Sequence, residues 1–162
     1  MADFNQAIVK TLAREGGATF TDGGADRGGA TKYGISQRAY PTLDIRNLSE
    51  QQAREVYKRD YWDRVAGDAL QSQLVAENIF DTAVNMGVRT AAKLAQLCAE
   101  VSPADGVMGA QSVQAINAVN EHQFLAAYTV SKVARYAAIC NKDKSQTKFL
   151  LGWINRSLGA VV

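Results

Sequence analysis

The feature that most constrains the fold of this chain is a repeat of apolar residues every three or four positions, which runs through most of its 162 residues. This spacing places apolar side chains on one face of an α-helix. Helix-breaking residues interfere little, since the sequence contains only two prolines. The pattern predicts a mainly α-helical protein, and a hydrophobic content of 47% is sufficient for a buried core without disulfides or metals.

Helix start and stop signals divide this pattern into separate helices. Asp3 precedes the first apolar stripe and is suited to cap it, while the glycines after Glu15 end it. Ser49 and Gln52 form a capping-box pattern at the start of a later helix. The expected helices span residues 4–15, 36–41, 50–64, 74–87, 88–101, 113–119, 124–140 and 149–154.

The charge and the metal-ligating residues exclude several classes of protein. A net charge of +2, with 21% charged residues and no dense basic run, does not indicate a nucleic-acid binder. His122 is the only histidine, and Cys98 and Cys140 lie far apart in apolar helical patterns. These residues do not form a zinc-site pattern. We therefore expect two buried free thiols, no metal and no cofactor, which argues against zinc-dependent hydrolases.

No segment of the sequence reads as a targeting or membrane-spanning element. The N-terminus lacks the basic and apolar regions of a signal peptide. No stretch approaches the roughly 20 apolar residues that cross a bilayer. We expect a chain that is made in the cytoplasm, has no visible route of export of its own and is not stably inserted in a membrane.

A glycine-rich stretch over residues 16–29 interrupts the helical pattern. Such a segment forms turns, and we expect a short hairpin around residues 19–21. Glu15 directly precedes it, at a helix end where the dipole is negative and Lys or Arg is more usual. Most glutamates at helix ends are surface residues, so position alone does not assign Glu15 a function.

The loop allows other polar side chains to approach Glu15. Glycoside hydrolysis needs a protonated acid at the leaving oxygen and an ionised carboxylate that guides water or stabilises the transition state. Glu15 and Asp26 are suited to these roles, and the Thr31 hydroxyl is suited to holding the water. Asp22 is an alternative second carboxylate, although an aspartate beside glycine is also a common turn residue.

Five blocks of sequence, in this order along the chain, resemble the motifs of a known family. The first is Glu15-Gly16-Gly17 followed by residues 26–36, in the pattern E-G-G…D-x-G-G-x-T-x-x-G-I-[ST]. The others are residues 57–62 (YKRDYW), 80–87 (FDTAVNMG), 105–109 (DGVMG) and 152–156 (GWINR). Together they resemble glycoside hydrolase family 108, lysozyme-like N-acetylmuramidases found largely as phage and prophage endolysins. The loop before Asp26 is longer than the common pattern, which leaves Asp22 as its competitor.

The resemblance implies a mainly α, lysozyme-like fold with a short β-hairpin or glycine-rich loop beside the active-site cleft. It implies a catalytic region over residues 1–85 and a helical C-terminal region of the peptidoglycan-binding type over residues 86–162, packed as one globule. The implied reaction is hydrolysis of the β-1,4 bond between N-acetylmuramic acid and N-acetylglucosamine. Glu15 is then the catalytic acid, while Asp26 and Thr31 manage water on the far side, which predicts inversion.

The matched blocks also supply candidate substrate-binding residues. Tyr61 and Trp62 are candidates for an aromatic platform under a sugar ring, with core packing as the alternative. The Asn85 amide is a candidate for binding an N-acetyl group, with helix termination as the alternative. Asp81 lies four residues earlier on the same helical face, and Tyr33 belongs to the first block.

Two alternatives to a muramidase stay open from the sequence. A lytic transglycosylase uses one acid/base and no second carboxylate. A non-catalytic wall-binding or structural module of a phage or secretion apparatus keeps the fold without the chemistry. The resemblance further implies a monomer whose partner is bacterial peptidoglycan, and which a separate membrane-permeabilising protein releases to the wall in the periplasm.

Overall fold

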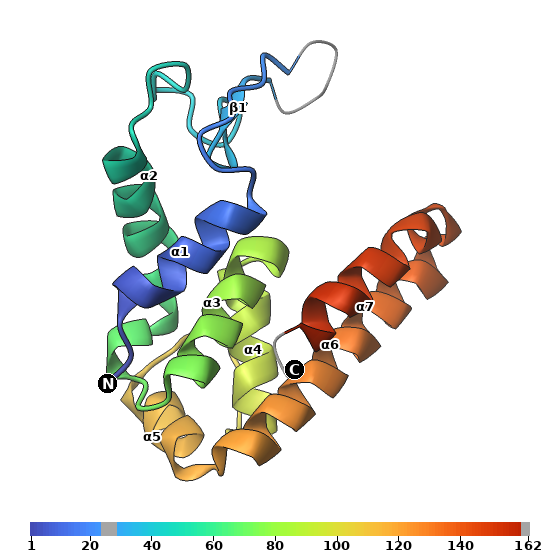
Figure 1. Cartoon of the computed structure of the whole chain (residues 1–162). Coiled ribbons are helices and arrows are strands. Elements are labelled where there is room, and N and C mark those ends of the chain that lie inside the picture. Colours follow the sequence, from blue (N-terminus) through green and yellow to red (C-terminus); the bar gives the residue numbers. More distant parts are fainter. Residues whose placement is uncertain (24–28, 160–162) are drawn as a thin grey trace.

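The computed structural model describes residues 1–23 and 29–159 (Figure 1). It confirms the predicted mainly α fold, because over these residues helices dominate and the sheet has two short strands. The strands are β1 (Thr31–Lys32) and β2 (Ile35–Ser36). The α-helices are α1 (Phe4–Arg14), α2 (Glu50–Tyr57), α3 (Gln73–Met86), α4 (Val88–Cys98), α5 (Ala110–Ala118), α6 (Glu121–Lys142) and α7 (Leu150–Leu158). Short π and 3-10 helices are η1 (Lys58–Trp62), η2 (Asp63–Val65), η3 (Gly67–Ala69) and η4 (Lys144–Phe149).

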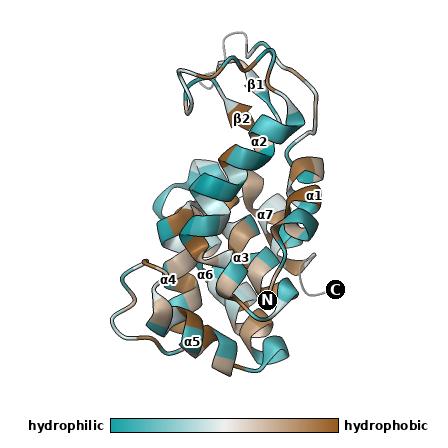
Figure 2. Ribbon diagram, turned by 90° about the vertical axis from the view of Figure 1, so that its left-hand side faces the viewer, coloured by the Kyte–Doolittle hydropathy of each residue, from teal (hydrophilic) through white to brown (hydrophobic). Residues whose placement is uncertain are grey.

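Helix α3 is the central element, since α1, α4 and α6 all pack against it. The β-hairpin lies at one end of the molecule, beyond α1 and α2, and α5 lies at the opposite end (Figures 1 and 2). Helices α6 and α7 form an antiparallel pair whose tip extends away from the other helices (Figure 1). None of the helices in the described ranges combines the length and apolar character that a membrane span requires.

Aromatic rings form the centre of the core between α1, η1 and α3. Trp62 and Phe80 are fully buried, and their ring centroids lie 5.5 Å apart in an edge-on contact. Phe4 meets both rings, at 5.7 Å from Trp62 and 6.0 Å from Phe80. The Trp62 Nε1–H donates to Asp68 Oδ1 at 2.7 Å, so its buried polar atom is satisfied. This cluster holds α1 firmly against α3.

The predicted helix caps are confirmed. Asp3 accepts a hydrogen bond from the Asn5 N–H at the start of α1. Ser49 and Gln52 form the capping box of α2, in which each side chain accepts from the other residue's N–H. Helix α2 is mostly hydrophilic (teal in Figure 2) and continues through η1 and η2 to Val65, close to the expected end at Arg64.

The expected helix over residues 36–41 is wrong, because strand β2 ends at Ser36 and turns follow it. Strands β1 and β2 pair antiparallel, with Thr31 opposite Ser36. The two residues between the strands, Tyr33 and Gly34, have φ angles of 53° and 75°. Positive φ at both central positions is the geometry of the type I′ turn that best suits a two-residue hairpin. The hairpin expected at residues 19–21 is reduced to a single bridge between Thr21 and Thr31.

Candidate active site

Glu15 is the C-cap residue of α1 and lies where the chain turns toward the hairpin. Its N–H still donates to the Thr11 carbonyl at 3.0 Å, so the last turn of α1 sets its backbone. The next residue, Gly16, has a φ of 88°, which glycine adopts at little cost. The Glu15 side chain is 24% exposed. A carboxylate on a rigid helix end, partly open to solvent, is suited to meet a substrate.

A pocket of about 90 Å³ opens beside Glu15. Residues 34–36 of the hairpin form one wall, and the loop after the hairpin adds Ala39 and Tyr40. Tyr57 and Tyr61 line it from α2 and η1, and Val84 lines it from α3. The hairpin, the loop after it, α2, η1 and α3 therefore converge on one carboxylate, with tyrosine side chains around it. Polar rings around an acid are suited to a sugar, whose faces are apolar and whose edge carries hydroxyls.

Gly34 explains why the hairpin approaches Glu15 so closely. A Cβ at this position would lie 2.7 Å from both Glu15 Cβ and the Tyr57 hydroxyl oxygen. Only glycine leaves room for this contact, and its φ of 75° also disfavours a side chain. The Tyr57 hydroxyl donates to the Tyr33 carbonyl at 2.8 Å. Burial raises the pKa of Tyr57, and the Glu15 charge adds to this, so the hydroxyl stays a donor.

Arg156, which lies on α7 near the other end of the sequence, also contacts Glu15. Its Nη2 lies 3.2 Å from Glu15 Oε1 and 2.9 Å from Asp81 Oδ1, and its Nε lies 3.1 Å from Asp81 Oδ2. Arg14 Nη1 also bonds Asp81, at 2.8 Å. Burial pushes the pKa of Asp81 upward, but the hydrogen bonds and charges of the two arginines outweigh it and lower that pKa. Asp81 is thus an anion that holds two cations.

The structure does not place the other predicted catalytic residues in the wall of this pocket. Thr31 lies on β1, where its hydroxyl donates to the Gly29 carbonyl at 3.3 Å, and it does not line the pocket. Its partner in the register, Ser36, does line it. Asp22 is exposed and lies outside the pocket wall. Asp26 lies outside the described residues, so its role stays a prediction.

The predicted substrate-binding residues separate into several environments. Tyr61 lines the pocket beside Glu15, and its ring centroid lies 5.7 Å from that of Tyr57. Trp62 does not form a platform: it is 0% exposed, because it fills the aromatic core. The sequence cannot distinguish an exposed aromatic ring from its buried neighbour, whereas the helical turn of η1 points Tyr61 and Trp62 in different directions.

The other three predicted binding residues already have partners within the protein. Tyr33 is buried, with its carbonyl bonded to Tyr57. Asp81 is bonded to both arginines, as described above. Asn85 is exposed, and its Nδ2 donates to the Tyr136 hydroxyl at 2.6 Å. Of these three, Asn85 is the side chain that solvent, and therefore a ligand, reaches most easily.

Several residues around Glu15 were not among the predicted site residues. Gly34, Tyr40 and Tyr57 line the pocket, and Arg156 forms an ion pair with Glu15. Gly34 and Arg156 belong to blocks that the family comparison of the sequence had marked, but neither residue type by itself indicated a role. Tyr40 lies within the helix expected over residues 36–41, so the sequence did not predict its approach to the pocket. Its hydroxyl donates to Asp60 Oδ2 at 2.8 Å, which orients the ring.

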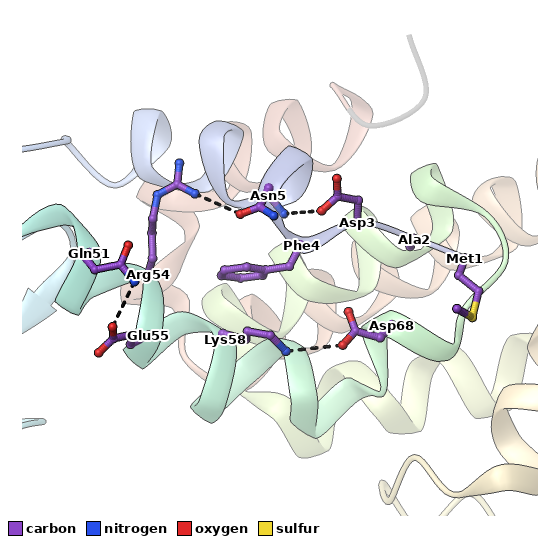
Figure 3. A pocket seen from close by; sticks show the side chains of 10 residues that line it. All are labelled: Met1, Ala2, Asp3, Phe4, Asn5, Gln51, Arg54, Glu55, Lys58 and Asp68. Carbon is purple, nitrogen blue, oxygen red and sulfur yellow. Dashed lines mark hydrogen bonds and ion pairs between the residues drawn. The ribbon is translucent and has the colours of Figure 1, made fainter.

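Larger hollows also lie in the described part of the molecule, and none of those below is lined by Glu15. One, of about 520 Å³, lies at the N-terminal end of α1 beside α2 and η1, where Lys58 pairs with Asp68 and Arg54 bonds Asn5 (Figure 3). Another, of about 650 Å³, lies between α5 and residues 66–71. Two further hollows, of about 140 and 250 Å³, are lined by Asp81 and by Tyr33, but not by Glu15. The small pocket beside Glu15 is therefore the candidate active site.

Both cysteines are free thiols, as predicted. Cys140 is buried, but Cys98 is only partly so, which corrects the expectation that both are buried. Burial still raises the pKa of Cys98, so its thiol is a poor nucleophile. Among the residues that the structure describes, no group of three or more His, Cys, Asp or Glu side chains is arranged to hold a metal.

Comparison with known families assigns the class of protein. Residues 8–87 match the family model described as glycosyl hydrolase 108, and residues 82–158 match that of a predicted peptidoglycan domain. The first match contains every residue that lines the Glu15 pocket, and the second contains Arg156. The chain belongs to the glycosyl hydrolase 108 family, with a C-terminal peptidoglycan domain. It is a glycosidase that acts on peptidoglycan.

One solved structure gives a comparison over the whole length. The structure of Brucella abortus SagA matches with a TM-score of 0.72 and 25% sequence identity, covering 98% of this chain and 95% of that one. No match was found among the curated proteins. The similarity extends through both family matches, so the α6–α7 pair belongs to the shared fold.

Proposed function

We propose that this protein is a muramidase that hydrolyses the β-1,4 bond between N-acetylmuramic acid and N-acetylglucosamine, with Glu15 as the general acid. The observation that carries the proposal is the position of Glu15, whose half-buried carboxyl faces a pocket lined by tyrosines and by the hairpin. Glu15 protonates the glycosidic oxygen as the bond to the sugar carbon breaks. Tyr61 and Asn85 are proposed to contact the sugars.

The second half of the mechanism concerns the water. We propose that Asp26, with Asp22 as the alternative, activates the attacking water and that the Thr31 hydroxyl helps to hold it. The attack then comes from the face opposite Glu15, and the product has inverted configuration. NMR of the fresh digest tests this step, because an inverting enzyme releases the α-anomer first. A β-anomer as the first product would contradict it.

A lytic transglycosylase is a second candidate, favoured by one observation. Among the described residues that line the pocket, Glu15 is the only carboxylate. A transglycosylase needs a single acid/base, because the sugar's own hydroxyl attacks in place of water. Mass spectrometry of digested peptidoglycan separates the two reactions. Reducing ends support the muramidase, and 1,6-anhydro ends support the transglycosylase.

The experiment that tests the role of Glu15 is the Glu15→Gln variant. We expect it to bind cell walls as the wild type does but to clear no turbidity from a wall suspension, because the amide cannot donate a proton as an acid does. Glu55→Gln is the matched control, since Glu55 is an exposed carboxylate on α2 that bonds only the nearby Gln51 among the described contacts. Lysis by Glu15→Gln at the wild-type rate would overturn the proposal.

We propose that the biological setting is lysis of a bacterial host by a phage or prophage. The support is the resemblance of the sequence blocks to endolysins of this family. The protein is made in the cytoplasm and acts as a monomer on the wall after a separate membrane-permeabilising protein releases it. Expression in bacteria tests this, because cells should lyse only when the membrane is also permeabilised. Light scattering tests the monomer.

A further inference from the structure

Arg156 joins the C-terminal helix α7 to the end of α1, across a sequence separation of 141 residues. Among the described residues that follow α3 in the sequence, Arg156 alone forms a hydrogen bond and an ion pair with Glu15. Its side chain is 25% exposed, close to the 24% of Glu15. The contact is therefore shielded from solvent, where a charged hydrogen bond is stronger than on an open surface.

The geometry of Arg156 is fixed by Asp81 rather than by Glu15. Asp81 accepts from both Nε and Nη2, and this two-point contact fixes the plane of the guanidinium. Arg14 holds the same carboxylate from the side of α1. With its plane set, Arg156 presents Nη2 to Glu15 Oε1 in one orientation. Hydrogen bonds therefore connect four side chains in sequence: Arg14 to Asp81, Asp81 to Arg156, and Arg156 to Glu15.

The remaining neighbours of Glu15 cannot replace this contact. Tyr57, Tyr61 and Tyr40 approach from α2, η1 and the loop after the hairpin, and all are neutral phenols. The hydroxyl of Tyr57 is already donated to the Tyr33 carbonyl. Burial disfavours a charged guanidinium, but Asp81 and Glu15 outweigh it and raise the pKa of Arg156. Arg156 is thus the permanent positive charge at the site.

We propose that Arg156 is a positioning residue for Glu15, so that the peptidoglycan domain supplies part of the active site. This inference rests on the proposed function of Glu15. Arg156 holds one carboxyl oxygen, which leaves the other, Oε2, to face the hairpin side, where it lies near Gly34. When Glu15 has given its proton to the leaving oxygen it becomes a carboxylate, and Arg156 stabilises that negative charge. The C-terminal domain then contributes to the reaction.

The test compares substitutions at Arg156 using soluble glycan fragments, for which kcat and KM are measured separately. For Arg156→Gln we expect a fall in kcat of about 10- to 100-fold with little change in KM, because the acid is misplaced but the sugar sites remain. Arg156→Lys should give an intermediate kcat, because lysine keeps the charge but loses the two-point contact.

Arg135→Gln is the matched control, because Arg135 is an exposed arginine on the neighbouring helix α6 and the charge change is the same. It should leave kcat and KM as in the wild type. A folded Arg156→Gln protein with wild-type kcat would overturn the inference. If that variant does not fold, Arg156→Lys decides, and wild-type kcat in that protein overturns it. Activity in Glu15→Gln would instead overturn the proposed function itself.

Discussion

The aromatic core around Trp62 and helix α7 are held in place in different ways. Around Trp62, four aromatic rings meet edge-on with centroids 5.5 to 6.4 Å apart, and the largest of them are fully buried. On α7, Trp153 stacks on Tyr136 at 4.9 Å, but Leu151 is 70% exposed. Of the described residues of α7, only Ser157 is buried. Apolar burial holds the core around Trp62, whereas the stack on Tyr136 and the ion pairs of Arg156 hold α7.

This difference applies to Glu15 and Arg156, the two paired residues of the candidate active site. Glu15 ends a helix whose buried face is part of the aromatic core, so its backbone is rigid. Arg156 lies on a helix with little apolar burial, and Asp81 fixes it through hydrogen bonds. Elements with few buried apolar contacts open at lower free energy than the core. We therefore expect the acid to be stable in position and its partner to be sensitive to changes in α7.

The largest effect on stability is expected from Trp62→Ala. Removing a fully buried ring leaves a cavity, and the Asp68 carboxylate loses a hydrogen bond. We expect the free energy of unfolding to fall by about 3–5 kcal/mol, as measured by urea denaturation. Val130→Ala on the exposed side of α6 is the control and should change it by less than about 0.5 kcal/mol. Similar losses in both variants would contradict the assignment of the core.

Gly34→Ala should damage the active site more than the fold. The new Cβ would collide with Glu15 Cβ and the Tyr57 hydroxyl, and its φ of 75° adds strain. We expect a loss of about 1–3 kcal/mol in unfolding free energy. We also expect a fall in kcat of about 100-fold, because the acid is displaced.

Gly152→Ala in α7 is the contrasting control for Gly34→Ala. Nothing lies within 4 Å of a Cβ at Gly152, which is exposed within the helix. This variant should gain about 0.5–1 kcal/mol from helix propensity, with activity unchanged. If Gly34→Ala is as active as Gly152→Ala, the close contact between the hairpin and Glu15 does not control the reaction.

Trp153→Ala tests how α7 is held. It removes the stack on Tyr136 and the contact with Phe149, at 4.9 and 5.9 Å between centroids. We expect a loss of about 1–2 kcal/mol, smaller than for Trp62, because the ring is only partly buried. Hydrogen exchange should show faster opening of α7 while α1 and α3 stay protected, together with a lower kcat. Uniform destabilisation of all helices would show that the two regions unfold as one.

Lys132 gives the smallest effect and tests the packing of α6 on α3. Its Nζ donates to Asn78 Oδ1 at 3.2 Å, and burial lowers its pKa to about 8 despite the attraction of Asp81; Arg14 and Arg156 add to the lowering. Between that value and the unfolded value of 10.5, the unfolded chain binds more protons, so stability rises with pH. Relative to Lys132→Met, the wild type should gain about 1 kcal/mol from pH 8 to pH 9. A constant difference would show that Lys132 is not held in a desolvated site.

The helices and their caps were predictable from the sequence because the signals are local. Asp3, Ser49 and Gln52 act within one helical turn, and the apolar stripes give the buried face of each helix. Glu15 was predicted as the acid from the glycines beside it and from the family pattern, whose match is confirmed. The hairpin was misplaced because its turn depends on positive φ at Tyr33 as well as at Gly34, and few tyrosines adopt that conformation.

By itself, the sequence determined the class of fold, the family and the residue at the centre of the site. Periodicity and capping act between residues three or four apart, so they are visible in a linear chain. Only the tertiary structure decided that Trp62 belongs to the core while Tyr61 faces Glu15, and that Arg156 reaches Glu15 from the other end of the chain. Those outcomes depend on which helices pack together. The contacts of buried charges and rings join residues far apart in the sequence, and local sequence patterns do not indicate them.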